Sequence, residues 1–243
     1  MSATYLKYEI VRTLRNRMGF VFSLLFPVVT FLVIALSQDR TAFIRRTGGI
    51  PPATYYMIGL LGFGGIGAVL SGGGRIAVDR ALGWNRQLLL TPLKPWVYLA
   101  SKVVIGYLVA GMTLVVMYAA GIAAGARGPV EQWVEMTALV LIGLIPFAAM
   151  GIWIGHATNA DAVGPIMGGS MMLFGLLGGA WFPLGGWMRT IGEYLPSYWM
   201  TSAGRVALGN GGWPVKGWLV VGCWALALGV LAARAYRTDT KRR

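Results

Sequence analysis

Six long apolar runs divide this sequence and restrict it to one class of fold. They cover approximately residues Gly19–Leu36, Thr54–Leu70, Val103–Ala126, Met136–His156, Val163–Phe182 and Val215–Ala233. A helix needs about 20 apolar residues to cross a bilayer, and helices satisfy their own backbone polar groups inside hydrocarbon. The sequence therefore predicts an all-α integral membrane protein with six transmembrane helices, in a single domain over residues 1–243.

The composition agrees with this class of fold. Hydrophobic residues make up 56% of the chain and charged residues only 12%, whereas a soluble domain has about 25% charged residues. The formal net charge of +13 is concentrated at the ends of the apolar runs, where basic residues set the orientation of a membrane protein. The charge therefore indicates membrane topology rather than nucleic-acid binding.

The basic residues also predict which side each terminus occupies. Six crossings place both termini on one side. That side has four Lys or Arg residues before the first run, five between the second and third runs, and five after the last, against seven in the other segments. Because Lys and Arg are enriched on the cytoplasmic side, both termini are predicted to be cytoplasmic.

The stretch between the second and third apolar runs has the densest charge. Its ionised residues are Arg75, Asp79, Arg80, Arg86, Lys94 and Lys102. Such a segment is expected at or beyond the membrane surface. Its residues favour a helix up to Leu90, and Thr91-Pro92 should end that helix. We predict a short cytoplasmic helix with a rigid turn that another protein can push, within a loop at residues 71–102. A basic loop that only sets topology is the alternative.

The N-terminal segment, residues 1–18, is predicted to be an interfacial helix. In a helix, one face is apolar and the other carries Glu9, Arg12, Arg15 and Asn16, a pattern typical of a helix lying in the membrane surface. A solvated basic tail is the alternative. A cleaved signal peptide is disfavoured, because the first apolar run is longer than the usual apolar region of a signal peptide.

A second informative segment, residues 183–214, lies before the last apolar run. It is too polar and too interrupted by proline to span, and it could form short helices at residues 187–195 and 198–208. Glu193 and Arg205 could pair across the two helices. Its many Trp and Tyr residues are typical of the membrane interface. We predict a broken re-entrant helical hairpin at the outer face, with a loose surface loop as the alternative.

Small residues spaced four apart predict close helix packing. They are Gly64/Ala68/Gly72, Gly121/Gly125, Gly164/Gly168 and Gly175/Gly179.

Several kinds of chemistry are missing from the sequence. No G-x-x-x-x-G-K-[ST] motif occurs, so ATP binding by a P-loop is not expected. One cysteine, Cys223, and one histidine, His156, leave no cluster for a metal site. Asp161 is expected to cap the fifth span rather than to carry a coupling ion. The sequence therefore predicts no catalytic, metal or cofactor site in this chain, but a translocation pathway without its own energy source.

Two motifs and the order of parts carry a resemblance to a known family. The charged stretch contains Asp79-Arg80, Gly83, Leu88-Leu89-Leu90, Thr91-Pro92-Leu93 and Lys102. The segment before the last run contains Phe182-Pro183-Leu184, Trp187, Leu195-Pro196 and Arg205. With the basic N-terminal segment and six spans, these features resemble the membrane (permease) subunits of bacterial type-2 ATP-binding-cassette (ABC) exporters over essentially the whole chain. One departure is Arg86-Gln87, where the family often has Glu.

The resemblance implies a mechanism and partners. Two permease copies or homologues pair in the bacterial inner membrane, and each docks a cytoplasmic ATPase that holds ATP and Mg. The loop after the second span acts as a coupling helix, and a drug-like, antibiotic or lipid-like amphipathic substrate is exported. The implied coupling residues are Arg75, Asp79, Arg80, Gly83, Arg86, Thr91, Pro92 and Leu93. The implied hairpin residues are Pro183, Trp187, Glu193, Pro196 and Arg205.

Two other functions stay open at this point. A secondary carrier or channel would need an internal repeat of three spans, and the two halves show no convincing similarity. A membrane scaffold or assembly factor needs no partner ATPase. The substrate, and the choice between homodimer and heterodimer, cannot be read from the sequence.

Overall fold

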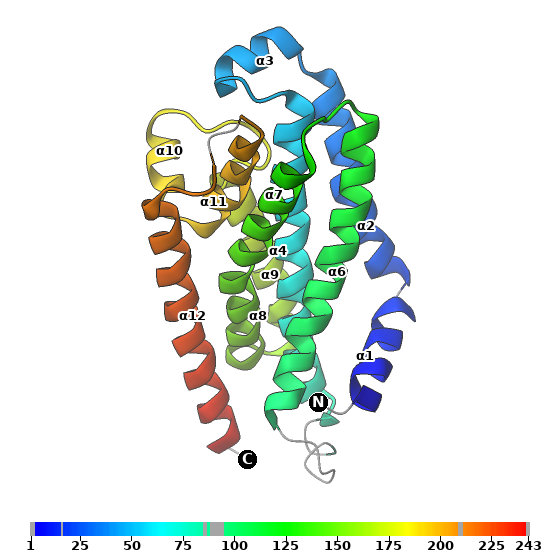
Figure 1. Ribbon diagram of the computed structural model, residues 1–243. Coiled ribbons are helices and arrows are strands. Elements are labelled where there is room, and N and C mark those ends of the chain that lie inside the picture. Colours follow the sequence, from blue (N-terminus) through cyan, green and yellow to red (C-terminus); the bar gives the residue numbers. More distant parts are fainter. Residues whose placement is uncertain (1–2, 16, 85–86, 88–94, 209–210, 242–243) are drawn as a thin grey trace.

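The computed structural model describes the chain except for residues 1–2, 16, 85–86, 88–94, 209–210 and 242–243. The described chain is a bundle of helices (Figure 1). In order, they are α1 (Ala3–Arg15), α2 (Arg17–Ser37), α3 (Arg40–Thr47), α4 (Pro52–Ala81), α6 (Pro95–Ala123), α7 (Val130–Gly143), α8 (Ile145–Ala157), α9 (Ala160–Leu177), α10 (Gly186–Gly192), α11 (Pro196–Ser202), the 3-10 helix η1 (Ala203–Leu208) and α12 (Val215–Lys241).

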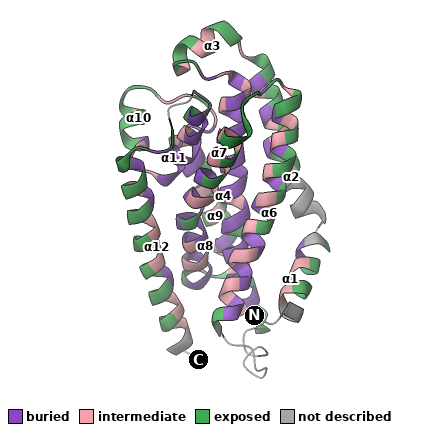
Figure 2. Ribbon diagram, in the orientation of Figure 1, coloured by how far each residue is buried: buried purple, intermediate pink, exposed green. Residues whose placement is uncertain are grey.

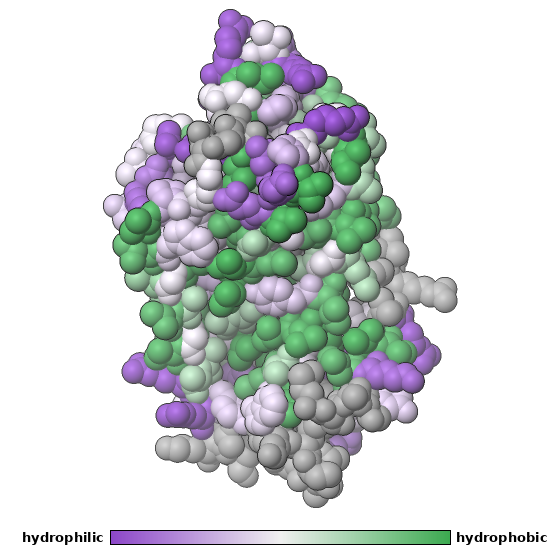
Figure 3. Space-filling view, viewed as in Figure 1, coloured by the Kyte–Doolittle hydropathy of each residue, from purple (hydrophilic) through white to green (hydrophobic). Residues whose placement is uncertain are grey.

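Five stretches among the described residues are long and apolar enough to cross a membrane: α4, most of α6, α7 with α8, α9 and most of α12. The count rises to six if Leu24–Ser37 and Arg40–Thr47, which meet at 103°, form one bent span. On the face in Figure 3, hydrophobic residues fill the middle of the molecule and hydrophilic residues gather toward its ends. The predicted all-α membrane fold is confirmed.

Helix α4 is the centre of the bundle. About 83% of its apolar window is buried, compared with 17–28% for α6, α9 and α12. It packs against α2, α6, α8 and α9, and Figure 2 shows it as the most buried element. The outer helices therefore leave broad apolar surfaces, as expected where lipid or another chain covers them.

Glycine explains how α4 packs so closely. A Cβ atom at Gly73 would overlap the backbone of Gly151 in α8, and one at Gly72 would lie 2.6 Å from the carbonyl oxygen of Lys102 in α6. The prediction of close packing is thus confirmed at Gly72. At Gly164 and Gly168 an added Cβ would meet no atom within 4 Å, because this side of α9 faces away from the described bundle, and close packing there stays a prediction.

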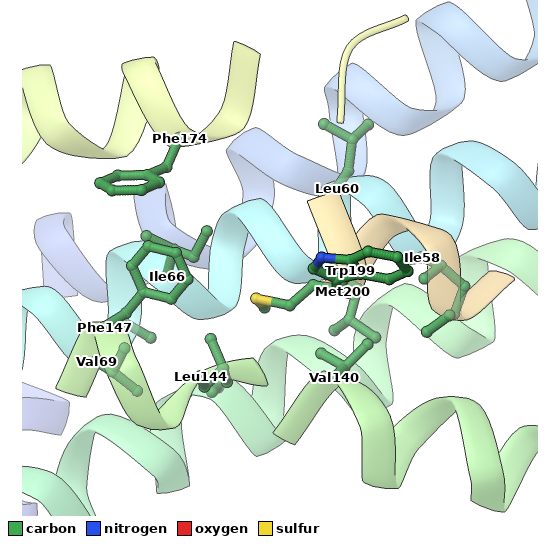
Figure 4. Close-up of a cluster of buried hydrophobic side chains, with 14 of the residues drawn as sticks. Ile58, Leu60, Ile66, Val69, Val140, Leu144, Phe147, Phe174, Trp199 and Met200 are labelled. Atoms are coloured by element: carbon green, nitrogen blue, oxygen red, sulfur yellow. The ribbon is translucent and has the colours of Figure 1, made fainter. Parts of the chain in front are cut away.

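The apolar core extends from the middle of the bundle into the hairpin region (Figure 4). Phe147 of α8 and Phe174 of α9 meet edge to face with ring centroids 5.0 Å apart. Trp199 and Met200 of α11 are buried, and α11 packs against α4, α7 and α12. The described hairpin is therefore two short helices and η1, and its second helix lies inside the bundle rather than in a loose surface loop.

Several boundaries differ from the sequence predictions. The segment after the first span contains helix α3, whose N-cap Asp39 accepts hydrogen bonds from the N–H groups of Thr41 and Ala42 at 2.8 and 3.0 Å. The fourth span begins at Val130 and is divided at Leu144 into α7 and α8, because Pro146 has no N–H to donate. Asn159, not Asp161, caps α9, by accepting from the N–H of Ala162 at 2.8 Å.

Candidate functional site: the charged end of the bundle

Both termini lie at the same end of the bundle, where α4 ends and α6 begins (Figure 1). Helices α3, α10 and α11 lie at the opposite end. The residues that the sequence implicates in coupling are thus at the terminal end, and the predicted hairpin residues are at the other.

The charged stretch is not a separate loop over its whole length. Arg75, Asp79 and Arg80 lie in the last turns of α4, which continues to Ala81, and Lys102 lies in the first turns of α6. Helices α4 and α6 therefore extend beyond the apolar runs that end near Leu70 and begin at Val103, and the predicted loop at residues 71–102 is shorter than expected. The charges are compatible with these helices because they pair with one another inside the protein.

Helix α4 ends at Ala81, within the stretch predicted to be helical up to Leu90, and residues 85–86 and 88–90 of that stretch lie outside the described residues. The N–H of Leu82 bonds to the carbonyl of Val78, and the N–H of Gly83 bonds to the carbonyl of Arg80 at 3.1 Å. Gly83 has a φ of 69°, a left-handed conformation that glycine adopts without steric cost and that commonly ends helices. Gly83 therefore turns the chain out of α4 within the predicted coupling loop.

A buried ion cluster joins α1, α4 and α6. The Lys102 Nζ donates to Glu9 Oε1 at 2.6 Å and to Asp79 Oδ2 at 2.8 Å. The side chains of Lys102 and Asp79 are each only 1% exposed. Tyr98 Oη also donates to Asp79 Oδ2, at 3.0 Å, and Arg12 Nη1 donates to Asp79 Oδ1, at 3.2 Å. Buried charges are tolerated when they are paired and hydrogen-bonded in this way.

Helix α1 contacts the bundle through its polar residues. Glu9 and Thr13 are buried, and Arg75 Nη1 donates to Thr13 Oγ1 at 2.6 Å. The assignment of Glu9 to the outward polar face of an interfacial helix is therefore wrong, because Glu9 turns inward to Lys102. Tyr8 and Val11 are exposed instead. Whether α1 lies in the membrane surface stays a prediction.

Arg80 connects α4 to two further helices. Its Nη1 lies 3.2, 2.8 and 3.3 Å from the carbonyl oxygens of Gly155, His156 and Thr158, at the C-terminal end of α8. Its Nη2 forms an ion pair with Asp239 of α12 at 3.1 Å. A cation at a helix C-terminus satisfies the last carbonyl groups and the helix dipole. The end of α4 is thus linked to α1, α6, α8 and α12.

A cavity of about 490 Å³ lies beside the ion cluster, between α1 and the segment after α4. Its walls include the side chains of Tyr8, Leu82 and Trp84, which are 70%, 70% and 40% exposed. Among the described residues, no group of His, Cys, Asp and Glu could hold a metal ion.

The remaining predicted residues lie either outside the described residues or at the opposite end of the bundle. Arg86, Thr91, Pro92 and Leu93 lie outside the described residues.

In the hairpin, Pro196 begins α11 as expected, Pro183 lies before α10, and Trp187 is exposed. The predicted pairing of Glu193 with Arg205 is not formed. Glu193 instead accepts from Arg189 Nε at 3.1 Å and Lys216 Nζ at 2.6 Å. These hydrogen bonds, first that of Lys216, lower the pKa of Glu193 below its ordinary value.

The family model described as "ABC-2 family transporter protein" matches residues 41–234. This chain belongs to the ABC-2 transporter family. A Bacillus subtilis (strain 168) protein named "Putative transport permease YvfS" is 28% identical over 212 residues, which cover 85% of this chain and 84% of that protein. The resemblance inferred from the sequence is confirmed, and the chain is a transporter permease subunit of the ABC-2 family, whose members associate with an ATP-binding subunit.

The sequence analysis missed part of the ABC-2 permease's ion cluster. Glu9 and Tyr98 were not among the predicted site residues, and Lys102 was read as the end of a loop. Glu9 lies 93 positions from Lys102, so no local spacing connects them. The one available signal was that Glu9 is the only acidic residue in a basic N-terminal segment.

Proposed function

We propose that this chain is the permease subunit of an ABC exporter. It forms the translocation path for an amphipathic, drug-like or lipid-like substrate, and it does not hydrolyse ATP itself. A separate cytoplasmic ATPase binds ATP and Mg and drives transport. Two permease copies, or this chain and a homologue, form the path together. The family membership supports this proposal, and the geometry at the end of α4 carries it further.

The observation that carries the proposal is the set of links from the end of α4. A force applied after Gly83 reaches α1 and α6 through Asp79, and it reaches α8 and α12 through Arg80. Buried, hydrogen-bonded charges hold a fixed geometry and transmit a displacement rather than absorb it. We therefore assign Arg75, Asp79, Arg80, Gly83, Arg86 and Thr91-Pro92-Leu93 to ATPase coupling.

The test replaces Thr91, Pro92 and Leu93 with glycine in the permease purified with its ATPase. We expect the complex to assemble in the membrane, but ATP-driven export of a panel of fluorescent amphipathic dyes, measured as their uptake into inverted vesicles, to fall to background. The matched control is the same triple replacement at residues 130–132, at the opposite end of the bundle. Unchanged efflux in the Thr91–Leu93 variant would reject the coupling assignment. Efflux that needs an ion gradient but no ATPase would favour a secondary carrier.

We also propose that the terminal end faces the cytoplasm. The distribution of Lys and Arg along the sequence supports this orientation, and Figure 1 places both termini at one end. With Cys223 changed to serine, single cysteines at Arg127 and Thr238 report the two ends. In intact cells, a membrane-impermeant maleimide should label the cysteine at position 127 and not the one at 238. The reverse pattern would overturn the orientation.

A further inference from the structure

A pocket at the end opposite the ion cluster is lined by three arginines from three separate elements. Arg46 comes from α3, Arg189 from α10 and Arg205 from η1, and Tyr55 and Tyr198 also contribute to the walls. The cavity has a volume of about 100 Å³. This is smaller than the roughly 300–1,000 Å³ of pockets that enclose whole drug-sized ligands. The pocket therefore has room for one small polar group rather than for a complete amphipathic substrate.

The charge of this pocket is poorly compensated. Glu193 pairs with Arg189, but it shares its carboxylate with Lys216. Among the described residues, neither Arg46 nor Arg205 forms an ion pair, and both are exposed. The pocket thus has three guanidinium groups, and only that of Arg189 contacts a carboxylate, which is also bound to a lysine. A recess lined by charges of one sign focuses the electrostatic potential and attracts anions.

Three hydroxyl groups of the pocket wall, those of Thr47, Tyr55 and Ser202, already donate to backbone carbonyls. Tyr55 Oη donates to the carbonyl of Gly179 at 2.7 Å, and Thr47 Oγ1 lies 2.9 Å from the carbonyl of Ile50. Ser202 Oγ donates to the carbonyl of Trp199 at 2.9 Å. The backbone uses each of these three hydrogens, whereas the guanidinium groups of Arg46 and Arg205 form no ion pair among the described residues. Guanidinium binds the oxygens of phosphate through paired hydrogen bonds, with fixed geometry.

The surroundings of the pocket indicate the source of the anion. Trp187 and Tyr194 of the hairpin are 70% and 61% exposed, and exposed Trp and Tyr at the end of a membrane bundle are typical of the headgroup region. Lys and Arg are enriched on the cytoplasmic side of membrane proteins. Arg46 and Arg205 lie at the end that is predicted to face away from the cytoplasm, so the distribution of charge does not explain them. A function in binding an anion accounts for their position at this end.

We propose that Arg46, Arg189 and Arg205 form a binding site for a phosphate-bearing anion, of the class found in the headgroup of an anionic phospholipid. The site goes beyond transport coupling and does not depend on it. Its walls belong to α3, α4 and the hairpin, so a bound phosphate holds the hairpin against the start of α4. The hydrogen bond from Tyr55 to Gly179 already joins these two parts.

The experiment measures binding of dihexanoyl phosphatidylglycerol to the full-length permease in a nonionic detergent, by calorimetry and by native mass spectrometry. Dihexanoyl phosphatidylcholine and inorganic phosphate are the comparison probes. We expect saturable binding of phosphatidylglycerol, weaker binding of phosphatidylcholine, and an affinity about tenfold lower in Arg46→Ala/Arg205→Ala, because charge-assisted hydrogen bonds are lost. Arg46→Lys/Arg205→Lys should retain part of the affinity.

The matched control is Arg45→Ala, which removes an exposed arginine of the same helix that does not line the pocket. Its affinity should stay within about twofold of the parent. If inorganic phosphate competes with phosphatidylglycerol, a free anion reaches the site. If it does not compete, the site is specific for lipid. Either result supports binding at the pocket.

Equal losses in Arg45→Ala and Arg46→Ala/Arg205→Ala would overturn the proposal, as would equal binding of the two lipids or no saturable binding. Thermal unfolding of each variant checks that it is folded, since all three arginines replaced by alanine here are exposed.

Discussion

The two ends of this bundle use charge in opposite ways. At the terminal end, Lys102 is buried between Asp79 and Glu9, and Arg12 also pairs with Asp79. At the other end, Arg46 and Arg205 are exposed, and no carboxylate pairs with them in the described chain. The first arrangement fixes helices in place, because each charge has lost its water and depends on its partners. In the second arrangement, the arginines can bind an anion that is not part of the described chain.

The buried charges of the ion cluster therefore stabilise the structure, whereas the exposed arginines are suited to binding a ligand. Exposed ion pairs contribute roughly 0–1 kcal/mol, so the arginine pocket adds little to folding and is free to serve a ligand. The ion cluster lies next to the predicted coupling segment, where loss of one charge would loosen α1, α4 and α6 together. Variants at the two ends should therefore differ strongly in stability.

The largest expected effect comes from Lys102→Met. The substitution keeps the length of the side chain but leaves Asp79 and Glu9 without their shared cation, and breaking a buried pair costs about 3–5 kcal/mol. Unfolding of the purified permease in mixed micelles with increasing SDS should show a loss of this size. Lys216→Met is the matched control, because Lys216 is 44% exposed and loss of its exposed pair should cost far less than loss of the buried one.

A second variant tests whether uncompensated buried charge causes the loss of stability in Lys102→Met. The triple variant Lys102→Met/Asp79→Asn/Glu9→Gln removes all three charges and should recover part of the lost stability, since no ion is left buried alone. If Lys102→Met and Lys216→Met unfold at the same SDS fraction, the terminal cluster does not hold the helices, and the contrast between the two ends fails.

The fold class could be predicted from the sequence because few backbone structures are stable inside a membrane. Apolar runs of about 20 residues leave helices as the available choice, and five of the six predicted spans correspond to long apolar stretches of the described chain. The ends of these helices were harder to predict. Charges such as Arg75 and Asp79 mark the edge of hydrocarbon only if they face lipid, and here they face other helices.

The candidate site was predictable in location but not in its contacts. The residues around Asp79 and Arg80 were found from the motif, whereas their partners Glu9 and Asp239 are distant in sequence. Packing glycines show the same limit, because Gly72 and Gly164 belong to similar four-residue patterns but only Gly72 meets a neighbouring helix. Spacing predicts a face of a helix, and tertiary structure determines what that face contacts.

The smallest expected effect comes from Glu193→Gln, at the end of the bundle opposite the ion cluster. The pKa of Glu193 is lowered in the folded protein, first by the hydrogen bond from Lys216, so its contribution is present above the ordinary carboxyl pKa of about 4.5. The contribution is lost as the pH falls through the lower folded-state pKa, because protonation removes the charge. At pH 7 the variant should lose about 0.2–1 kcal/mol, as expected for an exposed pair.

Thermal unfolding of the parent and of Glu193→Gln, from pH 7 down to pH 3, measures this difference. The two midpoints should converge as the pH falls below about 4.5. In a Lys216→Met background the effect of Glu193→Gln at pH 7 should shrink, because the first cause of the lowered pKa has been removed. A difference that grows toward acid pH would mean that Glu193 is not held as a carboxylate by these cations.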